Sequence, residues 1–171
     1  MLFGLPRLRV LAAFAMLPIP AAGSGAPVTQ GAPAEAAILS PLSVIKRADL
    51  DFGTLVVSGA GTAVIDPVSG SEAVTGPIVT AGTPGHPAKF TATGSKNAVA
   101  LIRLPKNPIN VTRVGGTETM TVTDWTVDGA INRRIPITDT FDFSVGATLN
   151  VAANQAEGTY TGTFTVTVQY P

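Results

Sequence analysis

The last fourteen residues, Gly158-Thr-Tyr-Thr-Gly-Thr-Phe-Thr-Val-Thr-Val-Gln-Tyr-Pro171, indicate the fold class. Between positions 160 and 170 the even positions read Tyr, Gly, Phe, Val, Val and Tyr, whereas the odd positions from 159 to 167 are all threonine. Successive side chains of a strand point to opposite faces, so this pattern predicts one β-strand with an apolar face and a hydroxyl-rich face. No strand follows it as a partner, and an apolar strand with an unpaired edge is an aggregation hazard unless another segment covers it.

The chain upstream of this strand also has β patterns, broken by glycine and proline turns. Short Thr- and Val-rich segments at this spacing predict an all-β, antiparallel sandwich, and no helical segment of useful length follows residue 37. The expected strands are 50–57, 63–65, 74–80 with an interruption at Gly76-Pro77, 90–93, 99–104, 109–114, 119–127, 135–137, 140–145, 147–151 and 160–170.

The N-terminus has the organisation of a secretory signal peptide. Arg7 and Arg9 precede an apolar run over 10–19, and small residues follow at 20–23. We expect cleavage near Gly23; a membrane anchor is the alternative, but the run is short for a spanning helix. The expected organisation is a signal peptide over 1–23, a flexible leader over 24–37 and a β-sandwich domain over 38–171.

The composition excludes several classes of function. The chain has 11 basic and 11 acidic residues, so nothing in its charge favours nucleic acid or an anionic membrane as a partner. It has no cysteine and one histidine, so the ligands for zinc or iron–sulfur sites are missing. We expect no cofactor and no metal. A secreted domain without disulfides must be stabilised by its core or by assembly.

The leader, residues 24–37, is rich in Ala, Gly and Pro and has too little apolar bulk to fold alone. Its even positions nevertheless alternate weakly, which would allow it to become a strand after docking on another sheet. The candidate donor side chains are Val28, Ala32, Ala34, Ala36 and Ile38.

Single polar residues give no catalytic arrangement. His86 lies between Gly85 and Pro87, and a solvated loop histidine is the simplest interpretation. Asp49 and Asp51 alternate but have no regularly spaced oxygen ligands around them, which favours edge or turn acids over a calcium site. No nucleophile and base can be assigned, so we expect no catalytic residue and no enzyme activity.

Other polar motifs have equally simple structural explanations. Trp125 near Asp124 and Asp128 could bind a sugar, although a lone tryptophan in a small sandwich is more often in the core. The remaining motifs are interpreted as a solvated turn (Arg133-Arg134), a chance match to a glycosylation acceptor (Asn110-Val-Thr112) and a loop that opens no helix (Gly59-Ala-Gly61).

The C-terminal strand resembles the terminal strand of pilins assembled by the chaperone–usher pathway. Those subunits share alternating apolar residues, an aromatic residue next to last and a glycine fourteenth from the end, which here are Tyr170 and Gly158. A second resemblance, to secreted bacterial domains of unknown function akin to spore coat protein U-like pilins, rests on Ala48-Asp-Leu-Asp-Phe-Gly-Thr54, Phe90-Thr-Ala-Thr-Gly94 and residues 149–170. Many pilins have a disulfide, which this chain lacks.

The resemblance implies an immunoglobulin-like sandwich that lacks its last strand. A periplasmic chaperone would fill the resulting groove, and the leader of the next subunit would replace it at an outer-membrane usher, which gives an extracellular fibre. The implied groove residues are Gly158, Tyr160, Phe164, Val166, Val168 and Tyr170. We therefore expect a structural subunit of a surface fibre; the alternative is a self-complete binding module for glycans or surface adhesion.

Overall fold

The computed structural model describes residues 30–171. The expected signal peptide, residues 1–23, and the candidate donor residue Val28 lie outside the described residues. Within residues 30–171 there is no helix, and hence none long and apolar enough to cross a membrane. All strand pairs in this part of the chain are antiparallel, as predicted for an all-β sandwich.

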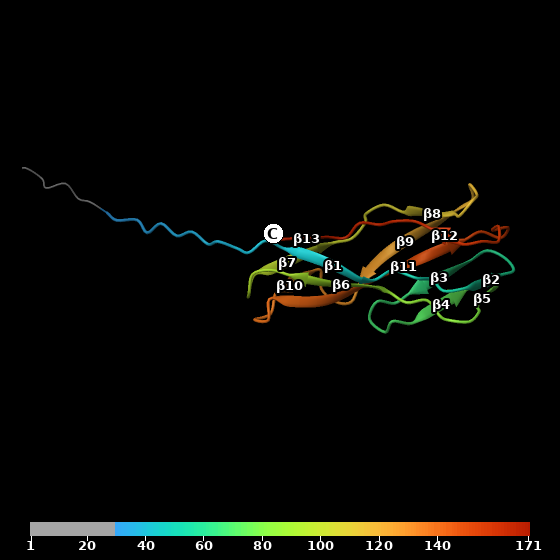
Figure 1. The fold of residues 1–171 in the computed structure, drawn as a ribbon, viewed down its shortest axis with the longest axis horizontal. Helices are drawn as coiled ribbons and strands as arrows, with labels where there is room; N and C mark the ends of the chain where they lie inside the picture. Colours follow the sequence, from blue (N-terminus) through green and yellow to red (C-terminus); the bar gives the residue numbers. More distant parts are fainter. Residues whose placement is uncertain (1–29) are drawn as a thin grey trace, which may run out of the picture. The chain divides into compact units, whose positions relative to one another are not determined.

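The largest of the three sheets in the described part of the chain is built around one long central strand, β11 (Figure 1). The central strand pairs with β6 through its first half, with β9 through its second half and with β3 at its end. In sheet order the strands are β1 (Ser43–Ala48), β6 (Ala88–Thr93), the central β11 (Thr140–Val151), β9 (Thr119–Val127), β8 (Ile109–Arg113) and β12 (Tyr160–Thr161), with β3 (Gly61–Ile65) and β4 (Glu72–Thr75) as a branch.

Two smaller sheets complete the domain. One is three-stranded, in the order β10 (Asn132–Arg134), β7 (Val99–Arg103) and β13 (Thr167–Gln169). The other pairs β2 (Leu55–Val57) with β5 (Ile78–Thr80). The immunoglobulin sandwich has strands A, B, E and D in one sheet and C, F and G in the other. Here β1-β6-β11-β9 follow the first order and β7-β13 follow C and F, and no described strand takes the place of G.

The core lies between the inner faces of the sheets, and the strand alternation determines which side chains reach it. Phe90 of β6 and Phe143 of β11 are paired in the register, and their rings stack with centroids 5.2 Å apart. Ile102 of β7 packs in the same cluster. A second cluster contains the fully buried or nearly buried side chains of Ala63, Ile78, Val122, Ala147, Leu149 and Val151.

Two expected strands have wrong boundaries, and one expected interruption is confirmed. Strand 50–57 shortens to β2 because Gly53 has a φ of +69°, in a turn where its N–H donates to Asp51 Oδ1 at 2.8 Å. The expected interruption of segment 74–80 at Gly76-Pro77 is confirmed, because the segment divides there into β4 and β5 and Gly76 has a φ of +77°. The expected strand at 135–137 lies at 132–134 instead, where β10 pairs with β7.

The two strands expected at 140–145 and 147–151 are one strand, β11. Gly146 lies between them without ending the strand, and a Cβ added there would lie 2.0 Å from the carbonyl oxygen of Ile65. The glycine therefore allows the end of β3 to approach the centre of β11 closely. Opposite this point Asp124 and Trp125 of β9 face a single residue, Ala147, which is the arrangement of a β-bulge.

The single C-terminal strand expected over 160–170 is also wrong in part. It consists of two short strands, β12 and β13, which pair with β8 in the large sheet and β7 in the three-stranded sheet. Between them, residues 162–166 leave one sheet and reach the other, so no ladder forms there. The alternation itself is present, since Phe164, Val166 and Val168 are half-buried and the threonines between them are exposed.

Candidate functional site

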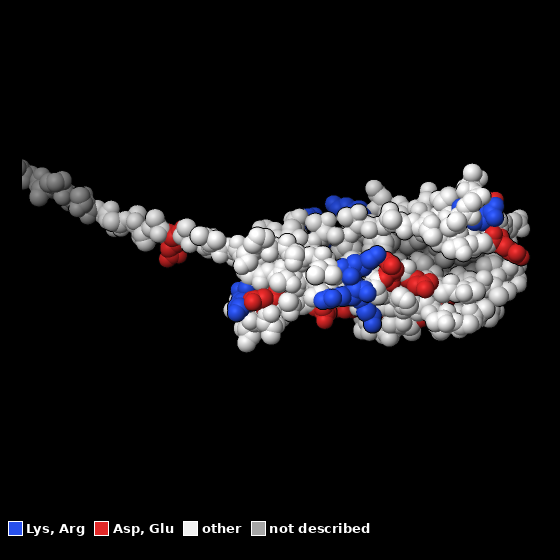
Figure 2. All heavy atoms as spheres, viewed as in Figure 1, with Lys and Arg blue, Asp and Glu red and all other residues white. Residues whose placement is uncertain are grey.

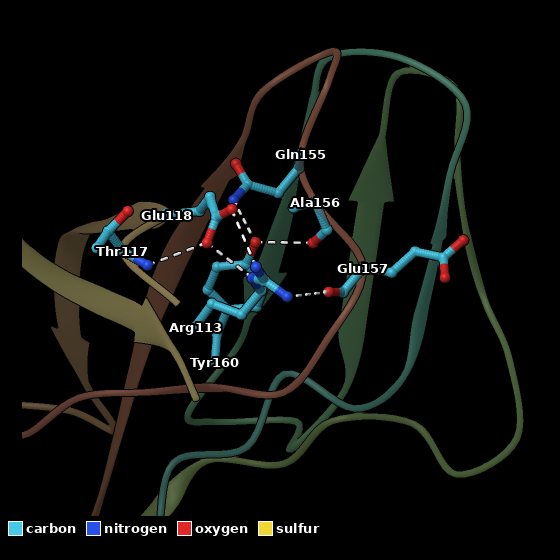
Figure 3. A network of polar contacts seen from close by, with 7 residues as sticks. All are labelled: Arg113, Thr117, Glu118, Gln155, Ala156, Glu157 and Tyr160. Carbon is cyan, nitrogen blue, oxygen red and sulfur yellow. Dashed lines mark hydrogen bonds and ion pairs between the residues drawn. The ribbon is translucent and has the colours of Figure 1, made fainter. Parts of the chain in front are cut away.

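The C-terminal segment, residues 158–171, is held at its start by a polar network around Arg113 (Figure 3). Arg113 donates two hydrogen bonds to the Glu118 carboxylate, at 2.7 and 3.0 Å, and a longer one to the carbonyl of Glu157 at 3.4 Å. These bonds lower the pKa of Glu118 from 4.5 to about 2, and the carboxylate in turn raises the pKa of Arg113. The network fixes the loop between β11 and β12.

Gly158 and Tyr160 belong to this start of the segment. Gly158 has a φ of +143°, and a Cβ added there would lie 2.9 Å from Cδ of Arg113. The Tyr160 hydroxyl donates to the Ala156 carbonyl at 2.7 Å and accepts from Nε2 of Gln155 at 2.6 Å. These two residues therefore anchor the segment before it reaches the three-stranded sheet.

Phe164 anchors the middle of the segment in the core. Its ring lies 4.6 Å from that of Trp125 and makes an edge contact with Phe90 at 6.4 Å, measured between centroids. The bulge in β9 turns Trp125 inward, toward this contact. Val166 and Val168 pack against the same core cluster and, like Phe164, stay half-buried.

Tyr170 closes the end of the segment through a ring of hydrogen bonds that we call the clasp, formed by Ser40, Ser95 and Tyr170. The Tyr170 hydroxyl donates to the Ser40 carbonyl at 2.8 Å and accepts from the Ser95 N–H at 2.8 Å. The Ser40 N–H donates to Oγ of Ser95 at 2.5 Å. Gly94 makes room, since a Cβ there would lie 2.9 Å from the tyrosine oxygen. An open depression of about 330 Å³ lies beside the clasp, lined in part by Pro41 and Lys96.

The clasp ties Ser40, three residues before β1, to Tyr170, which directly follows β13. β13 pairs with β7 along one edge, and no strand within residues 30–171 pairs with its other edge, which we call the open edge. In the large sheet, Val44 of β1 shares the core-facing side with Ala92, yet its side chain is 36% exposed. Lys46, on the same side of β1, is also exposed. Both features coincide with the place of strand G.

The described part of the leader is exposed and has no regular secondary structure. Residues 30–42 form neither helix nor strand. The candidate donor residues Ala32, Ala34, Ala36 and Ile38 are exposed, and Ile38 retains 96% of its accessible surface.

The other polar candidates have structural roles in the described part of the chain. Asp49 pairs with Lys46, and His86 is an exposed residue whose backbone bridges to Asp51. Asn110 is exposed on β8, and Gly59-Ala-Gly61 leads into β3. No group of three or more possible metal ligands occurs within residues 30–171.

We expected the doublet Arg133-Arg134 to be a solvated turn, but this interpretation is wrong, because both residues belong to β10. Arg133 is half-buried, pairs with Asp128 at 2.6 Å and lies over the ring of Phe143. Trp125, Asp124 and Asp128 do not form one exposed site. The tryptophan packs on Phe164, Asp124 is exposed, and Asp128 is engaged by Arg133.

A family described as a domain of unknown function, DUF4402, matches residues 42–170. The chain belongs to the DUF4402 family. The match contains all three stretches on which the second resemblance rests and runs from the start of β1 to Tyr170. No curated protein and no solved structure gave a significant match.

In this DUF4402 domain the sequence did not reveal Ser40 and Ser95 as partners of Tyr170. Gly94 was a usable signal, because a glycine after a regular strand can mark close approach of another segment. The alternation of Leu42, Val44 and Lys46 could likewise have indicated β1, with a lysine where the inner face is open.

Proposed function

We propose that the protein is a structural subunit of a bacterial surface fibre, assembled by donor-strand exchange. The observation that carries the proposal is the open edge of β13. The exposed, core-facing Val44 supports it, because it lies on β1, the strand whose leading segment the clasp ties to the end of β13. A strand added there would pair with the main chain of β13 and cover the half-buried side chains of the C-terminal segment. It would also remove the unpaired edge that makes such a strand prone to aggregation.

In this proposal the open edge has two successive occupants. A periplasmic chaperone covers it first, and at an outer-membrane usher the leader of the next subunit replaces the chaperone. The resemblance of the C-terminal segment to chaperone–usher pilins supports this order. The fibre is extracellular, and its function is structural rather than enzymatic.

The exposure of the leader suits a donor strand, but its side chains offer little apolar surface to bury. Ala32, Ala34 and Ala36 each bury little area, and Ile38 is the large apolar side chain of the described part of the set. Most of the joint's stability must then come from main-chain hydrogen bonds and from covering Phe164 and Val168, at about 0.5–1.5 kcal/mol for each hydrogen bond.

The test compares four forms of the secreted chain purified without a chaperone. The chain with its leader should form polymers visible by electron microscopy and sedimentation. Deletion of 24–37 should abolish growth. Replacing both Ala34 and Ala36 by Asp should do the same, because these side chains would enter the groove. Ala37→Asp is the matched control, since residue 37 would point outward. Fibres that grow equally well without the leader, or a stable monomer from the full chain, would contradict the proposal.

A further inference from the structure

The leader and the sheet that it would join carry charges of opposite sign. Glu35 is the only charged residue of the leader, is exposed, and forms no ion pair with any described residue. The outer face of the three-stranded sheet carries Arg103 and Arg134 and no acid, since Ala100 and Ile102 take the inner side of β7. Charged residues make up only 13% of the chain, and most of the face seen in Figure 2 is uncharged.

Arg103 is the cation of this sheet that lies nearest the open edge. In the register of β7 and β13 it pairs with Thr167, so only this short side chain separates it from a strand at the open edge. Arg134 lies one strand farther away, on β10, where it pairs with Val99. Arg103 forms no ion pair with any residue in 30–171.

The strand alternation of the leader points Glu35 toward this outer face. If the even-numbered leader residues enter the groove, the odd-numbered ones, including Glu35, share a face with Thr167 and Arg103. Two strand spacings separate a residue opposite Thr167 from Arg103, roughly 10 Å between Cα atoms. Extended arginine and glutamate side chains together span that distance, and threonine between them leaves room.

We propose, building on the proposed function, that the leader of a second copy adds to β13 with Glu35 opposite Thr167, so that its carboxylate pairs with Arg103. In either strand direction this register places Ala34 and Ala36 beside Val166 and Val168. A slip by one residue would turn Glu35 into the core, and a slip by two toward the C-terminus would move it to the row of Gln169, Leu101 and Asn132, which has no cation. Alanine side chains discriminate poorly between registers, so the ion pair selects one.

Disulfide trapping tests the register while Glu35 stays in place, and the natural chain has no cysteine to interfere. Directly opposed residues have Cα atoms about 4.5–5.5 Å apart, within the range of a disulfide. In oxidised fibres, Ala37→Cys should crosslink to Thr165→Cys if the strands are antiparallel, or to Gln169→Cys if they are parallel. Crosslinking of Ala37→Cys to Thr167→Cys instead would overturn the register.

A charge reversal tests the ion pair itself. Arg103→Glu should slow fibre growth by roughly three- to tenfold at low salt, and adding Glu35→Lys should restore the rate. Arg134→Glu is the matched control, with the same change of charge one strand farther away, and should leave the rate unchanged. Equal slowing by both reversals, or no rescue, would overturn the ion pair.

The outcomes separate the two proposals. If the unaltered chain forms no polymer, the proposed function fails and the register inference fails with it. If fibres form but the crosslinks or the rescue disagree, the register inference alone fails.

Discussion

The central strand β11 and the C-terminal segment have the same alternating sequence pattern but different surroundings. β11 pairs with β6 and then β3 along one edge, and with β9 along the other edge from Val145 onward, and its core-facing residues Phe143, Val145 and Ala147 are at most 1% exposed. The C-terminal segment has partners along one edge, and Phe164, Val166 and Val168 remain half-buried. Alternation shows which side chains face the core, whereas the place of a strand, inside a sheet like β11 or at its end like β12 and β13, governs how far those side chains are covered.

The largest loss of stability should come from a cavity in the core beneath β11. Phe143→Ala removes a ring that stacks on Phe90 and should lower the free energy of unfolding by about 3–5 kcal/mol. Chemical denaturation of a leaderless variant, which cannot polymerise in our proposal, measures this. A loss below about 1 kcal/mol would show that β11 is not the centre of the core.

The same truncation in the C-terminal segment should cost less. Phe164→Ala removes a half-buried ring, and we expect about 1–2 kcal/mol in the leaderless variant. A loss equal to that of Phe143→Ala would indicate that the segment is already fully covered, which would contradict the comparison.

Removing the clasp hydroxyl should have a smaller effect. Tyr170→Phe deletes two hydrogen bonds but keeps the ring, and water can solvate the exposed Ser40 carbonyl, so we expect about 1 kcal/mol. The amide of Ser95 should also exchange with solvent faster, as measured by NMR. Unchanged exchange at Ser95 would mean that the clasp does not protect this amide. Tyr160→Phe is the control at the other end of the segment.

The smallest effect concerns pH. The pKa of Glu118 falls from 4.5 to about 2 on folding, so the unfolded chain binds its proton first as the pH drops. The stabilisation from Glu118 is therefore present above about pH 4.5 and is lost as the pH falls toward 2. Glu118→Gln should flatten the pH dependence of the melting temperature in this window. A profile identical to that of the unaltered chain would show that the exposed pair with Arg113 contributes nothing measurable.

Side-chain periodicity made the all-β class and most strand positions predictable from sequence. It could not reveal the change of sheet within the C-terminal segment, because the apolar alternation of Phe164, Val166 and Val168 continues unbroken from the crossing into β13. Nor could it reveal the clasp, since Ser40, Ser95 and Tyr170 are brought together only by the sheet order. The bulge in β9 is visible afterwards in the shift of apolar positions from 120 and 122 to 125 and 127.

The clasp also bears on the mechanics of a fibre built as proposed. The candidate donor side chains end at Ile38 and the clasp holds Ser40, so only Leu39 separates the two along the chain. A linker of one residue leaves little freedom for bending, and successive subunits would form a stiff filament rather than a flexible string. Tension would enter each subunit at Ser40, where the clasp transmits it to the β6–β7 turn and the C-terminus instead of peeling β1 from its single partner. Fibres carrying Tyr170→Phe should therefore yield at lower force when pulled singly.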